Sequence, residues 1–121
     1  MKGATKHDAG KPQLSLNPIE ALELMSQALA YGAKKYGRAN FKKGHAFSRT
    51  LDAAMRHLAA IASGEFTDAE SGNPHLAHAL ASLAMLAHAM KHHPELDDLT
   101  EKPDPAGADA CILVTPLKET L

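Results

Sequence analysis

Prolines and glycines divide this chain into three apolar segments, and their positions most constrain how it can fold. Pro18 follows Asn17, a residue type that favours the N-cap of a helix. Glu20 stands three residues after Asn17, which is the spacing of a capping box. The first helix is therefore expected to begin at these residues and to end near Gly37.

Two further helices are expected, with a short turn between them. The second runs from about residue 48 to residue 63, before Gly64. The third begins near Pro74 and ends at His93, because Pro94 cannot continue it. A short connection makes such helices antiparallel neighbours, so we expect an all-α fold built on a helical hairpin.

Apolar residues recur every three or four positions in each segment, which predicts the side of each helix that faces the core. The predicted core positions are Leu22, Met25, Ser26, Leu29 and Ala33 in the first helix, Leu51, Ala54, Met55, Leu58, Ile61 and Ala62 in the second, and Leu76, Leu80, Leu83, Ala87 and Met90 in the third.

The core available to one chain is small. Hydrophobic residues make up 45% of the 121 residues, but there is no Trp and only two Tyr and three Phe. Alanine buries less apolar surface than leucine or phenylalanine, so an alanine-rich core gains less from burial. We expect a homo-oligomer, a dimer or a tetramer, formed through the small faces of Ala53, Ala60, Ala81 and Ala84.

Charge and cysteine content narrow the class of protein. Thirteen Lys and Arg against fourteen Asp and Glu give a net charge of -1, which excludes a dedicated nucleic-acid binder. The single Cys111 excludes an internal disulfide and suits a reducing compartment. No apolar signal core and no membrane-spanning stretch are visible, so a cytoplasmic protein is expected.

Residues 1–93 should form one domain, followed by an acidic, proline-containing tail over 94–121, in which CILVTP is either a short strand or a docking segment.

The turn between the second and third helices gathers carboxylates and imidazoles. Glu65, Asp68 and Glu70 lie in the turn GEFTDAESG, and His75 and His78 share one flank of the third helix at i and i+3. The hairpin should hold the turn beside His75. Each residue alone is also typical of a solvated turn or helix flank, but the group together indicates a metal or catalytic site.

His57 lies on the flank of the second helix, roughly 120° from the centre of its apolar stripe. Carboxylate oxygens and imidazole nitrogens together form a site for a divalent cation, with Mg or Mn favoured if carboxylates dominate and Zn or Mn if two histidines join. Glu20 and Glu23 form an alternative carboxylate pair, although the capping box would explain Glu20.

Basic residues flank the same region without forming a known phosphate loop. The pattern GxxxxGK[ST] is absent, so a phosphate site would have to use side chains and metal. Lys34 and Lys35 could instead complement a helix dipole, and Arg56 could pair with Asp52. The cations that a triphosphate would attract are Lys6, Lys11, Lys34, Lys35, Arg38 and Arg56.

The ordered motifs KHDAGKP, YGAKKYGRANF, DAAMRHLAA, GEFTDAESG and HLAHALA resemble the phage and bacterial dATP/dGTP diphosphohydrolase family, a MazG-like group that includes MazZ-like enzymes. The resemblance covers about residues 2 to 90 and implies an all-α, MazG-like hairpin or bundle completed by oligomerisation. It also implies Mg- or Mn-dependent hydrolysis of dGTP or dATP to a monophosphate and pyrophosphate in the host-cell cytoplasm. In phages that replace adenine by 2-aminoadenine, the dGMP would supply synthesis of the modified base.

The spacing of the residues, taken together with the reaction that the resemblance implies, predicts roles for individual residues. Glu65 and Asp68 would be catalytic, with Glu65 orienting or deprotonating the attacking water. The metal would be bound by Glu65, Asp68, His75, His78 and His57, with Glu70, Glu20 and Glu23 as alternatives. Substrate would be bound by Lys6, Asp8, Lys11, Lys34, Lys35, Tyr36, Arg38, Asn40 and Arg56.

Two other classes remain open from the sequence. An HD-type nucleotide phosphohydrolase would use His and Asp ligands, but the only HD dipeptide is His7-Asp8. A non-enzymatic helical interaction protein would explain the alanine-rich faces and leave the clustered titratable groups unexplained. Tyr31, Tyr36 and Phe41 are the aromatic residues near the basic segment, which favours a purine base as the stacking partner.

Overall fold

The computed structural model describes residues 3–101, and this part of the chain is helical. Its three α-helices are α1 (Ile19–Tyr36), α2 (Phe47–Ala62) and α3 (His75–His92). Short 3-10 turns occupy Leu14–Leu16, Asn40–Lys43 and Pro94–Leu96. Within residues 3–101 no strand forms, and an isolated bridge joins Thr67 to Pro74. The predicted all-α fold is confirmed for the described residues.

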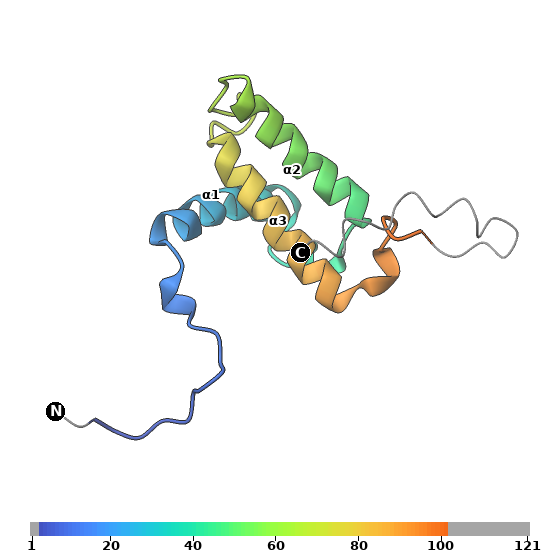
Figure 1. Cartoon of the computed structure of the whole chain (residues 1–121). Coiled ribbons are helices and arrows are strands. Elements are labelled where there is room, and N and C mark those ends of the chain that lie inside the picture. Colours follow the sequence, from blue (N-terminus) through green and yellow to red (C-terminus); the bar gives the residue numbers. More distant parts are fainter. Residues whose placement is uncertain (1–2, 102–121) are drawn as a thin grey trace, which may run out of the picture.

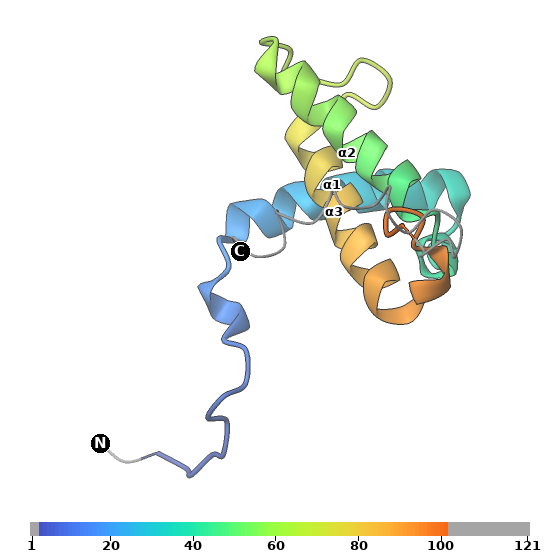
Figure 2. The same ribbon diagram turned by 45° about the vertical axis from the view of Figure 1, so that its right-hand side comes forward.

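Helices α2 and α3 form the predicted antiparallel hairpin, and α1 crosses α3 (Figures 1 and 2). Helix α3 is central because it packs against both other helices. The segment before α1 runs away from the helices in both views. No helix among residues 3–101 is sufficiently long and apolar to span a lipid bilayer.

The start of α1 differs from the predicted capping box. Asn17 Nδ2 donates a hydrogen bond to Leu14 O at 2.8 Å, and no side chain caps α1. Pro18 occupies the N-cap position instead. The prediction was wrong because Leu14–Leu16 forms a turn of its own, and Asn17 closes that turn.

Small residues of α3 make the close contacts of the core. Ala77 and Ala81 pack with Ala28 of α1, and the partly buried Leu24, Met25 and Leu29 cover this cluster. A second cluster joins Phe47 of α2 to Leu86 and Ala89 of α3, with Leu51 and Leu96 packed against it. Ala81 is thus buried inside the chain, so its predicted place in a contact between chains was wrong.

The predicted core stripes of α2 and α3 are confirmed only in part, since Leu51, Ile61 and Leu80 are partly buried while several other large residues are exposed. Met55 and Leu58 on α2 are 56% and 45% exposed, and Leu76, Leu83 and Met90 on α3 are 44%, 43% and 53% exposed. Leu22 and Ser26 of α1 are exposed as well. For these exposed residues the prediction was wrong, because α3 lies between two helices and turns Ala77 and Ala81 toward α1 and Leu86 and Ala89 toward α2.

The first part of the predicted tail packs on the helices. Asp98 accepts hydrogen bonds from the backbone N–H and the hydroxyl of Ser48 in the first turn of α2. Leu96 packs against the cluster around Phe47. The hydrogen bonds from Ser48 lower the pKa of Asp98, as is usual for a carboxylate at a helix N-terminus. Cys111 and the CILVTP segment lie outside the described residues.

Candidate functional site

A cleft of about 1070 Å³ lies where α1, α2, α3 and the segments that follow α1 and α2 meet. This volume is at the upper end of the range for small-molecule sites. Leu29, Met85 and several alanines form its apolar walls. Its polar and aromatic lining consists of Tyr31, Lys35, Tyr36, Arg38, Asn40, Phe41, His45, Arg49, His57, Asp68, Glu70, His78 and Ser82.

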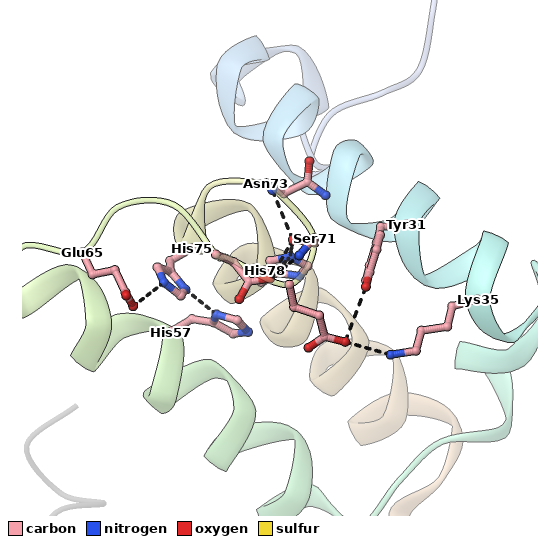
Figure 3. Close-up of polar contacts among 10 residues, drawn as sticks. Tyr31, Lys35, His57, Glu65, Ser71, Asn73, His75 and His78 are labelled. Carbon is pink, nitrogen blue, oxygen red and sulfur yellow. Dashed lines mark hydrogen bonds and ion pairs between the residues drawn. The ribbon is translucent and has the colours of Figure 1, made fainter.

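A chain of hydrogen bonds joins the α2–α3 turn to the wall of the cleft. Glu65 Oε2 lies 2.9 Å from His75 Nε2, and His75 Nδ1 lies 2.9 Å from His57 Nδ1. His75, the first residue of α3, is 6% exposed. Figure 3 shows these contacts, and among the three residues His57 alone lines the cleft. Glu65 and His75 therefore act on the cleft through His57.

A second chain of hydrogen bonds ends at His78. Ser71 Oγ lies 2.7 Å from both Asp68 Oδ2 and His78 Nε2, and the backbone N–H of Ser71 donates to the same carboxylate oxygen at 3.0 Å. The His78 and His57 rings are stacked, with their centroids 4.9 Å apart and an angle of 16° between their planes. The two chains of hydrogen bonds thus meet at adjacent imidazoles.

The environment favours a neutral His57 and an ionised Asp68. Burial lowers the pKa of His57, and the nearby His78 and His75 lower this pKa further. The hydrogen bond from the Ser71 hydroxyl lowers the pKa of Asp68. At neutral pH the cleft therefore presents a neutral imidazole close to an ionised carboxylate.

The α1 side of the cleft carries positive charge. Lys35 Nζ lies 3.0 Å from Glu70 Oε1, and the Tyr31 hydroxyl lies 3.5 Å from the same oxygen (Figure 3). The hydrogen bond to Glu70 raises the pKa of Lys35, so this lysine stays protonated. Arg38 and Arg49 also line the cleft.

The structure brings together only part of the substrate-binding set expected from the sequence. Lys35, Tyr36, Arg38 and Asn40 line the cleft, whereas Lys34 and Arg56 do not. Lys6, Asp8 and Lys11 are exposed in the segment before α1, away from the cleft. The carboxylates Glu20 and Glu23 are exposed on α1 and also lie outside the cleft.

The lining also contains residues that were not predicted from the sequence to belong to the site. Arg49 lies four and eight residues before Ala53 and His57, a helical spacing that could have placed it on the His57 face. Ser71 follows Asp68 by three residues in a turn, a spacing at which a side chain can cap a backbone N–H. His45 gave no comparable signal.

The donor chemistry at the end of the cleft suits a divalent cation, because Asp68, His57 and His78 offer carboxylate and imidazole ligands. In the described part of the chain, no three His, Cys, Asp or Glu side chains are grouped as a metal site. Both nitrogens of His75 lie within hydrogen-bond distance of side chains, Glu65 on one side and His57 on the other. Of the predicted metal ligands in the turn and on the two helices beside it, His57, Asp68, Glu70 and His78 therefore line the cleft, whereas Glu65 and His75 lie behind His57.

Comparisons with known proteins agree with the resemblance seen in the sequence. The profile of a family described as "dATP/dGTP diphosphohydrolase, N-terminal" matches residues 1–99. A curated relative from Salmonella phage PMBT28, named dATP/dGTP diphosphohydrolase, is 38% identical over 93 residues, which are 77% of this chain. The match spans 32% of that relative's length, about a third. No solved structure matches the chain.

Proposed function

Since this chain belongs to the dATP/dGTP diphosphohydrolase family, we propose that it hydrolyses dATP and dGTP to the deoxynucleoside monophosphate and pyrophosphate. The relative's name supports a diphosphohydrolase reaction on these two nucleotides. Water would attack the α-phosphorus, the bond from that phosphorus to the α–β bridging oxygen would break, and pyrophosphate would leave.

The observation that carries this proposal is that cationic side chains and a group of imidazoles with a carboxylate line the same cleft. Lys35, Arg38 and Arg49 provide cations, and His57, Asp68 and His78 provide proton acceptors and hydrogen-bonding groups in the same cleft. Phosphoryl transfer needs positioning and charge stabilisation rather than a protein nucleophile. Cations that hold the β- and γ-phosphates would leave the α-phosphorus facing the histidines.

The aromatic lining supports recognition of the base. Tyr31, Tyr36 and Phe41 all line the cleft, as the purine prediction requires. A purine offers more stacking area than a pyrimidine to such side chains. Asn40 lies in the same segment and supplies amide groups that can hydrogen-bond to a base or sugar. We propose that the base stacks against these aromatic side chains of the cleft.

His57 is placed to accept a proton from the attacking water, because burial keeps its imidazole neutral. We propose that Asp68 and His78 would hold a divalent ion, Mg or Mn, which when bound would neutralise phosphate charge and activate water, so that the single lone pair of neutral His57 stays available to the proton. Glu65 lies behind His75, so any effect of Glu65 on water would pass through the histidines.

The products formed from a panel of the eight common nucleoside triphosphates test the reaction. With Mg or Mn present, phosphorus NMR should detect pyrophosphate and monophosphate from dGTP and dATP. Tripolyphosphate and a nucleoside would instead indicate the HD-type reaction and overturn the proposal. Equal release of pyrophosphate from pyrimidine nucleotides would overturn only the purine preference. No turnover and no nucleotide-dependent thermal stabilisation would favour the interaction protein.

We further propose that the chain forms a homo-oligomer through exposed apolar residues of α2 and α3. No large hydrophobic side chain among the described residues is fully buried, while Met55, Leu58, Leu76, Leu83 and Met90 are exposed. A second copy of the same hairpin would bring an equivalent apolar surface to cover them, and exposed apolar surface of this kind is a usual interaction site.

A role in the synthesis of 2-aminoadenine would follow from preferred use of dGTP. The dGMP released from dGTP is a purine monophosphate that such a synthesis can consume, whereas dAMP is not its precursor. A clear preference for dGTP in the nucleotide panel would support this role. Equal turnover of dATP and dGTP would indicate general removal of purine deoxynucleotides instead.

A further inference from the structure

The hydrogen-bond donors and acceptors along Glu65, His75 and His57 restrict which protons these residues carry. An ionised Glu65 can only accept a hydrogen bond, so the proton between Glu65 Oε2 and His75 Nε2, 2.9 Å apart, belongs to His75. A neutral imidazole carries one proton on its two nitrogens. With Nε2 protonated, His75 Nδ1 is therefore an acceptor.

The contact between His75 and His57 then decides which nitrogen of His57 is protonated. His75 Nδ1 lies 2.9 Å from His57 Nδ1, and two bare nitrogens at this distance would repel one another. His57 must therefore donate from Nδ1, which leaves the lone pair on Nε2. The two nitrogens point to different sides of the ring, and Figure 3 shows His57 with one nitrogen toward His75 and the other turned away from it.

We infer that Glu65 and His75 are positioning residues, which fix neutral His57 as the Nδ1–H tautomer with its Nε2 lone pair available to the cleft. The inference deepens the proposed function, since a proton acceptor for water or a ligand for a metal needs that lone pair. It changes the sequence-based roles of Glu65 and His75 from direct metal ligands to groups that act through His57.

Burial gives this chain of hydrogen bonds its directing effect. His75 is 6% exposed, and its backbone N–H is fixed to Phe66 O at 2.8 Å. A buried ring in this position has little water available to replace either partner. Glu65 is more exposed, with 64% of its side chain accessible, yet within residues 3–101 it is the anionic acceptor at His75 Nε2.

The neighbouring histidine has the opposite tautomer. The Ser71 hydroxyl has one proton, which it donates to ionised Asp68 Oδ2 at 2.7 Å. Ser71 Oγ must then accept from His78 Nε2–H, also at 2.7 Å. The stacked rings of His57 and His78 thus carry their protons on different nitrogens, a difference that one spectrum can detect.

Nitrogen-15 NMR of the full chain, without nucleotide or metal, tests this assignment. At about pH 8, above the ordinary imidazole pKa of roughly 6.5, two-bond proton–nitrogen spectra distinguish protonated from bare ring nitrogens. We expect His57 to be protonated at Nδ1 and bare at Nε2, and His78 and His75 to be protonated at Nε2. Protonation of His57 at Nε2 would overturn the inference.

Variants separate a directing role from a structural one. Glu65→Gln replaces an acceptor by an amide that can also donate, so the direction is lost and the His57 tautomer ratio should shift roughly 3- to 10-fold toward Nε2–H. His75→Phe should cause a similar shift. His75→Gln should restore the Nδ1–H form, because its amide can donate to Glu65 and accept from His57. Glu70→Gln changes a residue of the same turn that bonds to Lys35 and not to Glu65, His75 or His57, so it should leave the ratio unchanged.

Added Zn²⁺ serves as a diamagnetic probe for direct ligation. The inference requires both His75 nitrogens to keep their hydrogen-bonded chemical shifts, whereas coordination of either His75 nitrogen would overturn it. An unchanged His57 ratio in Glu65→Gln would also overturn it. These outcomes are independent of the proposed reaction, since tripolyphosphate from the wild-type enzyme would refute the reaction and leave the tautomer result intact.

Discussion

Lys35 Nζ of α1 lies 3.0 Å from Glu70 Oε1 of the α2–α3 turn, and both residues line the cleft. A cation suited to a phosphate is therefore already paired with a carboxylate from the opposite side. The side chains of Lys35 and Glu70 are 45% and 69% exposed, so the pair contributes little to stability and can open when a stronger anion arrives.

Glu70→Gln should bind triphosphate more tightly than the wild type, because the anion that competes for Lys35 is removed. We expect a KM for dGTP several-fold lower, and a KM several-fold higher in Lys35→Ala, with melting temperatures close to that of the wild type. Steady-state kinetics at fixed metal concentration provide the measurement. A higher KM in Glu70→Gln would mean that Glu70 itself helps to bind the substrate complex.

Arg49 should contribute more to substrate binding than Arg56, although the sequence favoured Arg56. Only Arg49 lines the cleft, so Arg49→Ala should raise the KM for dGTP by about 10-fold or more through loss of a charge-assisted contact. Arg56→Ala, seven residues along the same helix, is the matched control and should change KM less than about 2-fold. The reverse order would place the triphosphate outside this cleft.

Asp68 and His78 should both be needed for turnover. Asp68→Ala and His78→Ala are each expected to lower kcat by about 100-fold or more while helical circular dichroism stays nearly intact. Asp68→Asn tests charge at similar volume and should lose activity as well. Asp52→Asn, on the exposed side of α2, is the control. Full activity of both Ala variants with Mg or Mn would show that the site is elsewhere.

Stability should fall as the pH is lowered through the range where unfolded histidine takes up a proton. The folded-state pKa of His57 is lowered by burial, so below about pH 6.5 the unfolded chain binds this proton more readily than the native chain. The melting temperature should therefore decrease from pH 7.5 to 5.5, and His57→Gln should reduce the slope.

The contribution of His88 to this slope has to be distinguished from that of His57. The pKa of His88 is also lowered, by desolvation and by the nearby His92 and His93. His88→Gln should reduce the slope independently, and His7→Gln in the exposed N-terminal segment is the control for a histidine substitution as such. A slope unchanged by His57→Gln would contradict the predicted direction of its pKa shift.

The exposed leucines should control assembly. At micromolar concentration, light scattering coupled to size exclusion should report a dimer or tetramer for the wild type, and Leu58→Glu or Leu83→Glu should yield monomers. Leu14→Glu is the matched control, since Leu14 is 73% exposed but lies outside α2 and α3. A monomeric wild type would refute the oligomer.

The sequence determined the helices because breakers and periodicity act locally. Gly37, Gly64 and Pro94 set helix ends within a few residues of the observed ones, since a left-handed glycine or a proline limits a helix whatever surrounds it. The ordered motifs also identified the family, and the grouping of His57, His75 and His78 around one turn followed from helical spacing and a short connection.

Tertiary structure decided which faces were buried and which titratable groups reached the cleft. The periodicity of α3 could not show that Ala77 and Ala81, rather than Leu76 and Leu83, would be buried, because burial depends on how closely two neighbours approach. Spacing likewise grouped Glu65 with Asp68, yet the turn directs Glu65 to His75 and leaves Asp68 in the cleft. Such a difference arises because side-chain direction in a turn is set by contacts between segments, which one-dimensional spacing does not contain.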